Sequence, residues 1–267
     1  MERARIEALA CKAKLRLLQM HYESGVGHIG GNLSALDILL ALYHLVLKED
    51  DGFVLSKGHA AGALYVALWS KGILSEDDLK TFHKDDTRLS GHPPAEGIPE
   101  IVFATGSLGH GMGLACGIAL GKKLKGESGT VFCLTSDGEW NEGSSWETLI
   151  FLTHRKLDNL VFIVDCNGLQ GFGTTREVAN LEPLAAKFAL FGAETVEVNG
   201  HNVEAIAEAL GTKRSGPLAI IARTIKGHGV SFMENKVEWH YLPLTAQQYE
   251  QACNEVQQAC ATFSVDH

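Results

Sequence analysis

In the second half of the chain, short apolar runs alternate with segments of helical spacing, and this alternation restricts the fold more than any other feature. The runs at 131–134 and 160–164 contain no polar residue. Strands with continuous apolar runs are typical of parallel sheets that are buried on both faces. Alternation of strands and helices along the chain favours the same arrangement. We therefore predict an α/β fold with a mostly parallel sheet and helices on both faces.

The remaining elements follow from the spacing of apolar residues. The segment 34–47 is apolar on nearly all sides, which indicates a buried helix, and a glycine-rich loop is expected at 24–32. The expected strands are 53–55, 130–135, 159–165, 194–198 and 217–223, and the expected helices are 2–21, 34–47, 59–70, 108–124, 144–155, 184–191, 203–210 and 245–263. Because no repeat or long linker divides the 267 residues, we expect a single domain over 1–267.

Charge and cysteine usage exclude several classes of protein. There are 32 acidic and 23 basic side chains, a formal net charge of −9, so we expect no nucleic-acid partner and no attraction to anionic membranes. Because the first turns are charged, we expect no signal peptide, and we also expect no segment with the roughly 20 apolar residues of a membrane span. The six cysteines form neither a disulfide framework nor a zinc ribbon, which favours a reducing, cytoplasmic location.

An acidic residue and an amide follow two neighbouring predicted strands. Asp137 and Gly138 come directly after the strand at 130–135, and Asn167 follows the next strand, one β-α-β unit later. The carboxyl ends of parallel strands are where open α/β sheets bind ligands. Carboxylate and amide oxygens suit Mg²⁺ or Ca²⁺, and Gly138 would allow a phosphate to approach the backbone. The alternative is that both side chains only stabilise turns.

Three histidines lie in predicted loops or at element ends rich in glycine and small residues: His28, His59 and His92. Imidazoles in loops above a rigid sheet can bind phosphate, hydroxyl or carbonyl oxygens. Taken singly, each histidine is more often a surface or core residue. The glycine-rich segment 105–111 opens a predicted helix and could cradle a phosphate or contact a flat ring. The segments 226–229 and 239–240 follow the last strand and form a further candidate rim.

Several familiar motifs are absent. The sequence contains no Gly-x-Ser-x-Gly elbow, no His-Glu-x-x-His and no Walker loop, so hydrolases and P-loop enzymes lose their main support. The first β-α-β unit also lacks the Gly-x-Gly-x-x-Gly fingerprint, which makes a nicotinamide-dependent dehydrogenase remote.

Taken together and in order, the motifs resemble the diphosphate-binding half of transketolase, a thiamine diphosphate enzyme, from about residue 15 to residue 243. They are Gly-His-x-Gly at 27–30, Ser-x-Gly-His-Ala at 56–60, Gly-His-Pro at 91–93, Thr-Gly-Ser-Leu-Gly-x-Gly at 105–111, Asp-Gly at 137–138 with Asn167, and Trp-His at 239–240. The resemblance implies the thiamine-diphosphate-binding fold of the diphosphate-binding domain. The chain departs from the family pattern at Ser136, where the first glycine of Gly-Asp-Gly is usual.

The resemblance also implies roles for individual residues. Mg²⁺ or Ca²⁺ would be bound by Asp137, Asn167 and the backbone carbonyl of Leu169. The cofactor would be held at its phosphates by His59, Gly138 and His240, with Asn167 close by, and at its rings by Gly106 and Leu108. The sugar and the transferred protons would face His28, His92 and His240. Glu142 and Glu147 match an acidic pair that lies between the two active sites of a dimer in the family.

The implied activity is ketol transfer, in which a two-carbon unit moves from a ketose, with or without phosphate, to an aldose. The cofactor supplies the electron sink and the protein supplies orientation and proton transfer. In the family, the carboxylate that activates the cofactor lies in a pyrimidine-binding domain, which we expect to find outside this chain. The resemblance therefore implies a partner subunit with the pyrimidine-binding and C-terminal domains, in an α2β2 assembly. The alternatives are a transketolase-like acyloin-forming enzyme acting on a non-standard sugar and a non-catalytic cofactor-binding half.

Overall fold

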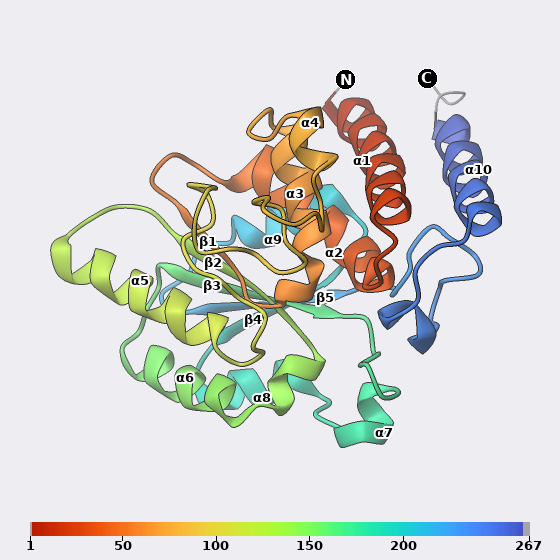
Figure 1. The fold of residues 1–267 in the computed structure, drawn as a ribbon. Coiled ribbons are helices and arrows are strands. Elements are labelled where there is room, and N and C mark those ends of the chain that lie inside the picture. The colour runs from red at the N-terminus through yellow and green to blue at the C-terminus, as the bar shows by residue number, and fades with distance from the viewer. Residues whose placement is uncertain (1, 264–267) are drawn as a thin grey trace.

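The computed structural model describes residues 2–263, in which a central sheet lies between two layers of helices (Figure 1). The strands are β1 (Gly52–Leu55), β2 (Val131–Ser136), β3 (Leu160–Cys166), β4 (Glu194–Asn199) and β5 (Leu218–Arg223). The α-helices are α1 (Glu2–Ser24), α2 (Ile29–Ala41), α3 (Ala61–Ser70), α4 (Glu76–Leu79), α5 (Gly111–Lys125), α6 (Gly143–His154), α7 (Thr175–Ala179), α8 (Leu184–Phe191), α9 (Val203–Leu210) and α10 (Ala246–Phe263). Each strand begins and ends within one residue of its predicted bounds.

The sheet has the predicted parallel architecture. Its five strands lie in the order β1-β2-β3-β5-β4, and every neighbouring pair is parallel. Helices α5, α6 and α8 cover one face, and α1, α2, α3 and α9 lie over the other (Figure 1). Along β3, Val161 and Ile163 pack into the apolar cluster of one face, whereas Phe162 and Val164 pack into the cluster of the other. This burial on both sides explains why the central strands are uninterrupted apolar runs.

Helix α2 begins earlier than the sequence predicts. The loop expected at 24–32 ends at His28, which has a left-handed backbone (φ 66°), and the helix starts at Ile29. Every residue of α2 is buried, and a π-helical turn (Leu42–Val46) continues it. The helical stretch Ile29–Val46 is therefore long and apolar enough to cross a membrane, contrary to the expectation that no such segment exists, but 83% of it is buried inside the protein. Helix α2 is thus a core helix of the domain.

Two short helices escaped the sequence analysis although their N-terminal signals are present. Helix α4 follows Ser75, whose side chain accepts a hydrogen bond from the backbone of Asp78 while Asp78 accepts one in return. Thr174 and Glu177 form the same reciprocal capping box at the start of α7. Such boxes satisfy backbone N–H groups that a helix end leaves unpaired. Both helices could have been predicted from these pairs.

One pair of cysteines is joined, which the sequence analysis did not anticipate. A disulfide links Cys11 on α1 to Cys260 on α10, across 249 positions of sequence. Helices α1 and α10 lie side by side in the fold (Figure 1). The other four cysteines are free: Cys116, Cys133, Cys166 and Cys253. The disulfide thus ties the last helix to the first.

Candidate functional site

The structure brings Asp137 and Asn167 together at the carboxyl ends of β2 and β3. The two strands are direct neighbours, with Ser136 paired to Asp165 in the register. Asp137 accepts hydrogen bonds from the backbone N–H groups of Gly138 and Gly168, each at 2.7 Å. The side-chain oxygen of Asn167 accepts one from the N–H of Leu169 at 3.0 Å. The prediction that both side chains lie at adjacent strand ends is confirmed.

The electrostatic setting of Asp137 suits a cation. The side chain is buried, and burial together with the nearby Asp165 carboxylate raises the pKa of Asp137 to about 7. Within residues 2–263, Asp137 forms no ion pair with a basic side chain, whereas Asp165 is paired with Lys57. A divalent cation would supply the positive charge that this carboxylate lacks.

Four histidines that are far apart in the sequence meet beside this edge: His28, His59, His92 and His240, which we call the histidine cluster. The ring of His28 lies 5.8 Å from that of His59, 6.1 Å from that of His92 and 5.1 Å from that of His240, measured between ring centres. The rings of His59 and His240 are 5.5 Å apart. The three glycine-flanked histidines of the sequence analysis and the Trp-His segment therefore contribute to one site.

All four imidazoles are neutral near pH 7. Burial and the neighbouring His92 and Lys226 lower the pKa of His28 to about 4. Burial and then the charge of Lys226 lower the pKa of His240 to about 3. Burial also lowers the pKa of His92, and the pKa of His59 falls well below its usual value for the same reason, assisted by Lys57. Neutral rings can both donate and accept hydrogen bonds, which suits contacts to phosphate or sugar oxygens.

Two buried lysines complete the site, and the sequence analysis did not assign either of them a role. Lys57 is fully buried against Asp165. Lys226 is 2% exposed, and its Nζ lies 2.9 Å from Nδ1 of His240. Burial and the charge of Lys57 lower the pKa of Lys226 to about 8. Because no acidic side chain of the described chain pairs with Lys226, an anion would be bound favourably here. The only signal in the sequence was its place in the candidate rim segment 226–229.

The glycine-rich turn at 105–111 lies against the histidine cluster. Gly106 has φ 142°, and a Cβ atom there would lie 2.9 Å from Cδ2 of His92. On the other side, a Cβ atom on Gly58 would lie 2.7 Å from the backbone nitrogen of Gly106. Only glycine allows this close approach. Leu108, two residues further on, is half-buried in the same turn.

Two buried polar atoms beside these residues have no hydrogen-bond partner: Oγ1 of Thr105 and Nε2 of Gln170. Thr105 precedes Gly106, and the Gln170 side chain packs where a Cβ atom on Gly138 would come within 2.9 Å of it. A buried polar atom without a partner is costly, and a bound ligand commonly satisfies it. The residues present thus fit a ligand with a phosphate group and a divalent cation.

The acidic residues after Asp137 separate into two environments. Glu142 and Glu147 are exposed on the surface, so their assignment to a subunit contact stays a prediction. Glu139 is fully buried and accepts hydrogen bonds from the Ser56 hydroxyl and from the N–H of Gly109. Burial raises the pKa of Glu139. Its contacts connect the 56–60 segment to the glycine-rich turn, which indicates a structural role.

Comparison with known proteins agrees with a site for a ligand that contains phosphate. The family described as transketolase, thiamine diphosphate binding domain, matches residues 9–266. The chain is 39% identical over 263 residues to a subunit of the apulose-4-phosphate transketolase of Phocaeicola vulgatus, covering 94% of this chain and 93% of that protein. It is 37% identical over 245 residues to the 6-deoxy-6-sulfo-D-fructose transketolase subunit SqwG of Clostridium sp., covering 87% and 89% of the two chains.

Longer proteins match over part of their length. The human transketolase is 38% identical over 259 residues, which are 92% of this chain and 41% of the human protein. The crystal structure of transketolase from Campylobacter jejuni superposes with a TM-score of 0.87 at 29% identity, covering 97% of this chain and 45% of that one. The chain thus spans less than half of these transketolases and nearly all of the relatives named as single subunits.

Proposed function

This chain belongs to the transketolase family as a thiamine diphosphate-binding domain, and we propose that it is the thiamine diphosphate- and metal-binding subunit of a two-component transketolase. The enzyme would transfer a two-carbon ketol unit from a ketose or ketose phosphate to an aldose acceptor. The main support is the meeting of Asp137, Asn167, the histidine cluster and Lys226 at one edge of the sheet. This arrangement would provide both a cation site and an anion site, as a cofactor with a diphosphate group and a metal ion requires.

The metal and the diphosphate would be held by the residues at the ends of β2 and β3. We assign Mg²⁺ or Ca²⁺ to Asp137, Asn167 and the carbonyl of Leu169, because hard oxygen ligands suit these ions. His59, Gly138 and His240 would bind phosphate oxygens, and the buried ammonium of Lys226 supports the negative charge. Gly106 and Leu108 would contact the rings. When bound, thiamine diphosphate supplies the electron sink of the reaction.

His28, His92 and His240 would supply proton transfer and orientation on the sugar side. The ammonium of Lys226 can only donate to Nδ1 of His240, so the neutral ring carries its own proton on Nε2 and can donate it. His28 and His92 are likewise neutral and can hold a sugar hydroxyl or accept its proton. The low pKa values keep His28 and His92 from being protonated at physiological pH, which preserves an acceptor on each of these two rings.

A second subunit would complete each active site. The chain covers 93% of a relative that is named as one subunit of its enzyme and 41% of the human transketolase, which supports a partner carrying the pyrimidine-binding and C-terminal domains. Large apolar side chains are exposed on one side of the sheet, on α6 and α8 and around α7: Ile150, Phe151, Phe172, Val178, Leu190 and Phe191. Exposed apolar surface favours a protein partner. We propose an α2β2 assembly in the cytoplasm, with no nucleic-acid or membrane partner and with Glu142 and Glu147 between its two active sites.

The names of the relatives favour a second candidate for the substrate. Two relatives of similar length are named for apulose-4-phosphate and for 6-deoxy-6-sulfo-D-fructose. A transketolase-like, acyloin-forming enzyme that acts on a modified sugar is therefore the alternative to one acting on ordinary sugar phosphates. A non-catalytic cofactor-binding half is disfavoured, because a structural remnant has no need for the full set of ligand-type residues.

Native purification tests these proposals together. The protein would be isolated without added cofactor, its intact complex weighed by native mass spectrometry, and its thiamine diphosphate and divalent metal content measured. A second chain in equal amount with bound cofactor is the expected result, and that material would then be screened with donor and acceptor sugars. A homo-oligomer that binds no thiamine diphosphate, even with Mg²⁺ and excess cofactor, would overturn the proposal.

A further inference from the structure

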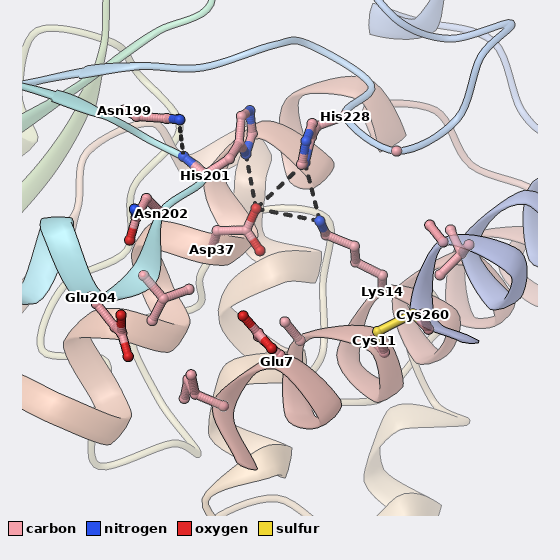
Figure 2. Close-up of a pocket in the computed structure, with 16 residues that line it drawn as sticks. Glu7, Cys11, Lys14, Asp37, Asn199, His201, Asn202, Glu204, His228 and Cys260 are labelled. Atoms are coloured by element: carbon pink, nitrogen blue, oxygen red, sulfur yellow. Dashed lines mark hydrogen bonds and ion pairs between the residues drawn. A yellow bond between two sulfur atoms is a disulfide. The ribbon is translucent and has the colours of Figure 1, made fainter. Parts of the chain in front are cut away.

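A second cluster of charged and imidazole side chains lies apart from the residues assigned above. Lys14, Asp37, His201 and His228, which we call the Asp37 cluster, line a cavity of about 450 Å³ between α1, α10 and the segment before α9 (Figure 2). The Asp37 side chain is 3% exposed and that of Lys14 is 15% exposed. Burial alone would raise the pKa of Asp37, but Lys14 and His201 hold it well below its usual range. This cluster touches the loop that follows β5.

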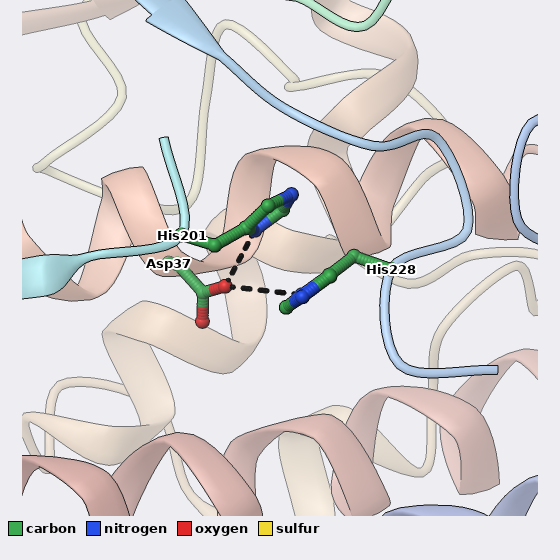
Figure 3. A group of neighbouring side chains, drawn as sticks. All are labelled: Asp37, His201 and His228. Atoms are coloured by element: carbon green, nitrogen blue, oxygen red, sulfur yellow. Dashed lines mark hydrogen bonds and ion pairs between the residues drawn. The ribbon is translucent and has the colours of Figure 1, made fainter. Parts of the chain in front are cut away.

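The Asp37 cluster has the composition of a metal site but not its free ligands. Asp37, His201 and His228 each bring a ligand atom within 4.8 Å of the others (Figure 3). However, Nζ of Lys14 lies 3.4 Å from Oδ2 of Asp37 and 3.1 Å from Nδ1 of His228, so the positive charge is already supplied. Both ring nitrogens of His201 are also engaged, Nδ1 with Asp37 and Nε2 with a backbone N–H, each at 2.8 Å. A metal ion here would have to replace contacts that these side chains already make.

The hydrogen bonds of His201 define which ring nitrogen carries the proton. The backbone N–H of Ile225 can only donate, so Nε2 of His201 must be the unprotonated acceptor. The proton of the neutral ring is then on Nδ1, where the carboxylate of Asp37 accepts it. The ring of His228 stacks on that of His201, with centres 3.4 Å apart and an angle of 15° between the planes. Asp37 thus selects the tautomer, and His228 restricts the tilt of the ring.

Ile225 precedes Lys226, the buried cation of the cofactor site. Around Lys226, the N–H of Gly227 donates to the carbonyl of Gly30 at 2.9 Å, and the carbonyl of Lys226 accepts from the N–H of Asn235 at 3.0 Å. Both of these anchors are backbone groups, whereas the anchor at Ile225 is the His201 side chain. We propose that His201, oriented by Asp37, is a positioning residue that sets Lys226 against His240. Its consequence for cofactor binding rests on the function proposed above.

Two substitutions of the same residue separate positioning from packing. His201→Leu removes both hydrogen bonds, whereas His201→Gln keeps an amide N–H for Asp37 and an amide oxygen for Ile225. In the purified protein with its co-purifying partner, we expect His201→Leu to weaken thiamine diphosphate binding, measured calorimetrically with Mg²⁺, about tenfold. We expect His201→Gln to stay within about twofold of the unaltered protein. Hydrogen exchange at the Ile225 amide should accelerate in His201→Leu and stay slow in His201→Gln.

A double substitution tests whether the effect passes through Lys226. If His201 acts by positioning that ammonium, His201→Leu should lose most of its effect on cofactor affinity in a Lys226→Met background. Independent, additive effects, or equal weakening by His201→Leu and His201→Gln, would overturn the inference. Should His201→Leu not fold, His201→Asn replaces it, since the shorter amide reaches only one of the two partners. If the unaltered protein binds no thiamine diphosphate, the proposed function fails, and the Ile225 exchange rates alone decide whether His201 anchors the loop.

Discussion

The proposed cofactor site, with Asp137, Lys226 and the histidine cluster, is built from the same kinds of side chain as the Asp37 cluster, yet the charges in the two places are balanced differently. In the Asp37 cluster the charge of Lys14 faces the carboxylate of Asp37, and both nitrogens of His201 are hydrogen-bonded. In the proposed cofactor site, Lys226 and Asp137 each form no ion pair with an oppositely charged side chain among residues 2–263. Buried histidine, lysine and aspartate therefore do not by themselves indicate a ligand site. A ligand site is indicated instead by buried charges without an ion-pair partner and by buried polar atoms without a hydrogen bond.

The largest expected effect is a loss of stability when the Asp37 cluster is altered. Lys14→Met removes the cation that faces the buried Asp37, and we expect the free energy of unfolding to fall by about 3 kcal/mol. His228 lies 3.5 Å from the same carboxylate and can compensate by taking up a proton. Burial lowers the pKa of His228, and the charge of Lys14 adds to this, so the folded Lys14→Met protein should take up a proton on His228 more readily than the unaltered protein, and the loss should be smaller at pH 6 than at pH 8. Urea denaturation at both pH values measures it.

The control for this variant is Lys12→Met, an exposed lysine on the same helix whose Nζ lies 5.0 Å from the centre of the Trp69 ring. We expect it to cost about 0.5 kcal/mol at either pH. Equal destabilisation by both substitutions would show that the Asp37 cluster does not depend on its central cation.

At Asp137 we expect the opposite pattern, in which stability is kept and cofactor affinity is lost. Asp137→Asn removes a buried charge that has no cationic partner in the protein, so the cofactor-free protein should be as stable as before or more stable. Affinity for thiamine diphosphate in the presence of Mg²⁺ should nevertheless fall about 100-fold, because a charged ligand is lost. Thermal melting and calorimetric titration give the two quantities. Asp85→Asn, in an exposed loop, should change neither; a destabilised Asp137→Asn protein with normal cofactor affinity would reverse our view of the site.

Lys226 gives the next largest effect. Lys226→Met should weaken thiamine diphosphate binding about 30-fold, the contribution of a charge-assisted hydrogen bond. It should also raise the pKa of His240, which burial and the charge of Lys226 hold near 3. Calorimetry and NMR titration of the imidazole would record the two changes. The exposed Lys71→Met is the matched control, and an unchanged His240 pKa would mean that the ammonium does not act on this ring.

The sheet was predictable because its strands depend on local sequence, whereas the start of α2 depends on tertiary contacts. Uninterrupted apolar runs can only be buried strands or helices, and their short length decided between the two. Gly30 and Gly31, in contrast, favour a loop by local preference. In the structure they lie in a buried helix, where Trp239 comes within 3.1 Å of the place of a Cβ atom on Gly30 and His59 within 3.6 Å of that on Gly31. No local pattern carries that information.

The candidate site likewise contains residues that the sequence predicts and residues whose position depends on tertiary contacts. The adjacency of Asp137 and Asn167 followed from the spacing of two parallel strands, and the histidines could be named but not joined until a family resemblance ordered them. Lys226 was missed because the burial of a lysine is decided by elements far away in the sequence. The pair Asp37 and His201, 164 positions apart, has no motif at all. Hydrogen-bond balance between distant residues becomes visible only in the structure.

The smallest expected effect is the pH dependence of cofactor affinity. It depends on the charge of Lys226 in the protein without cofactor and in the protein with bound cofactor. Burial and Lys57 hold the pKa of Lys226 near 8, below its usual 10.5. Between these values the folded protein without cofactor binds fewer protons than the unfolded chain, so this residue makes stability rise as the pH rises. A bound diphosphate favours the charged ammonium, so affinity for thiamine diphosphate should fall about tenfold from pH 7.5 to 9.5. Calorimetry over this range measures the slope, which should disappear in Lys226→Met. A slope that persists there would assign the titration to another group.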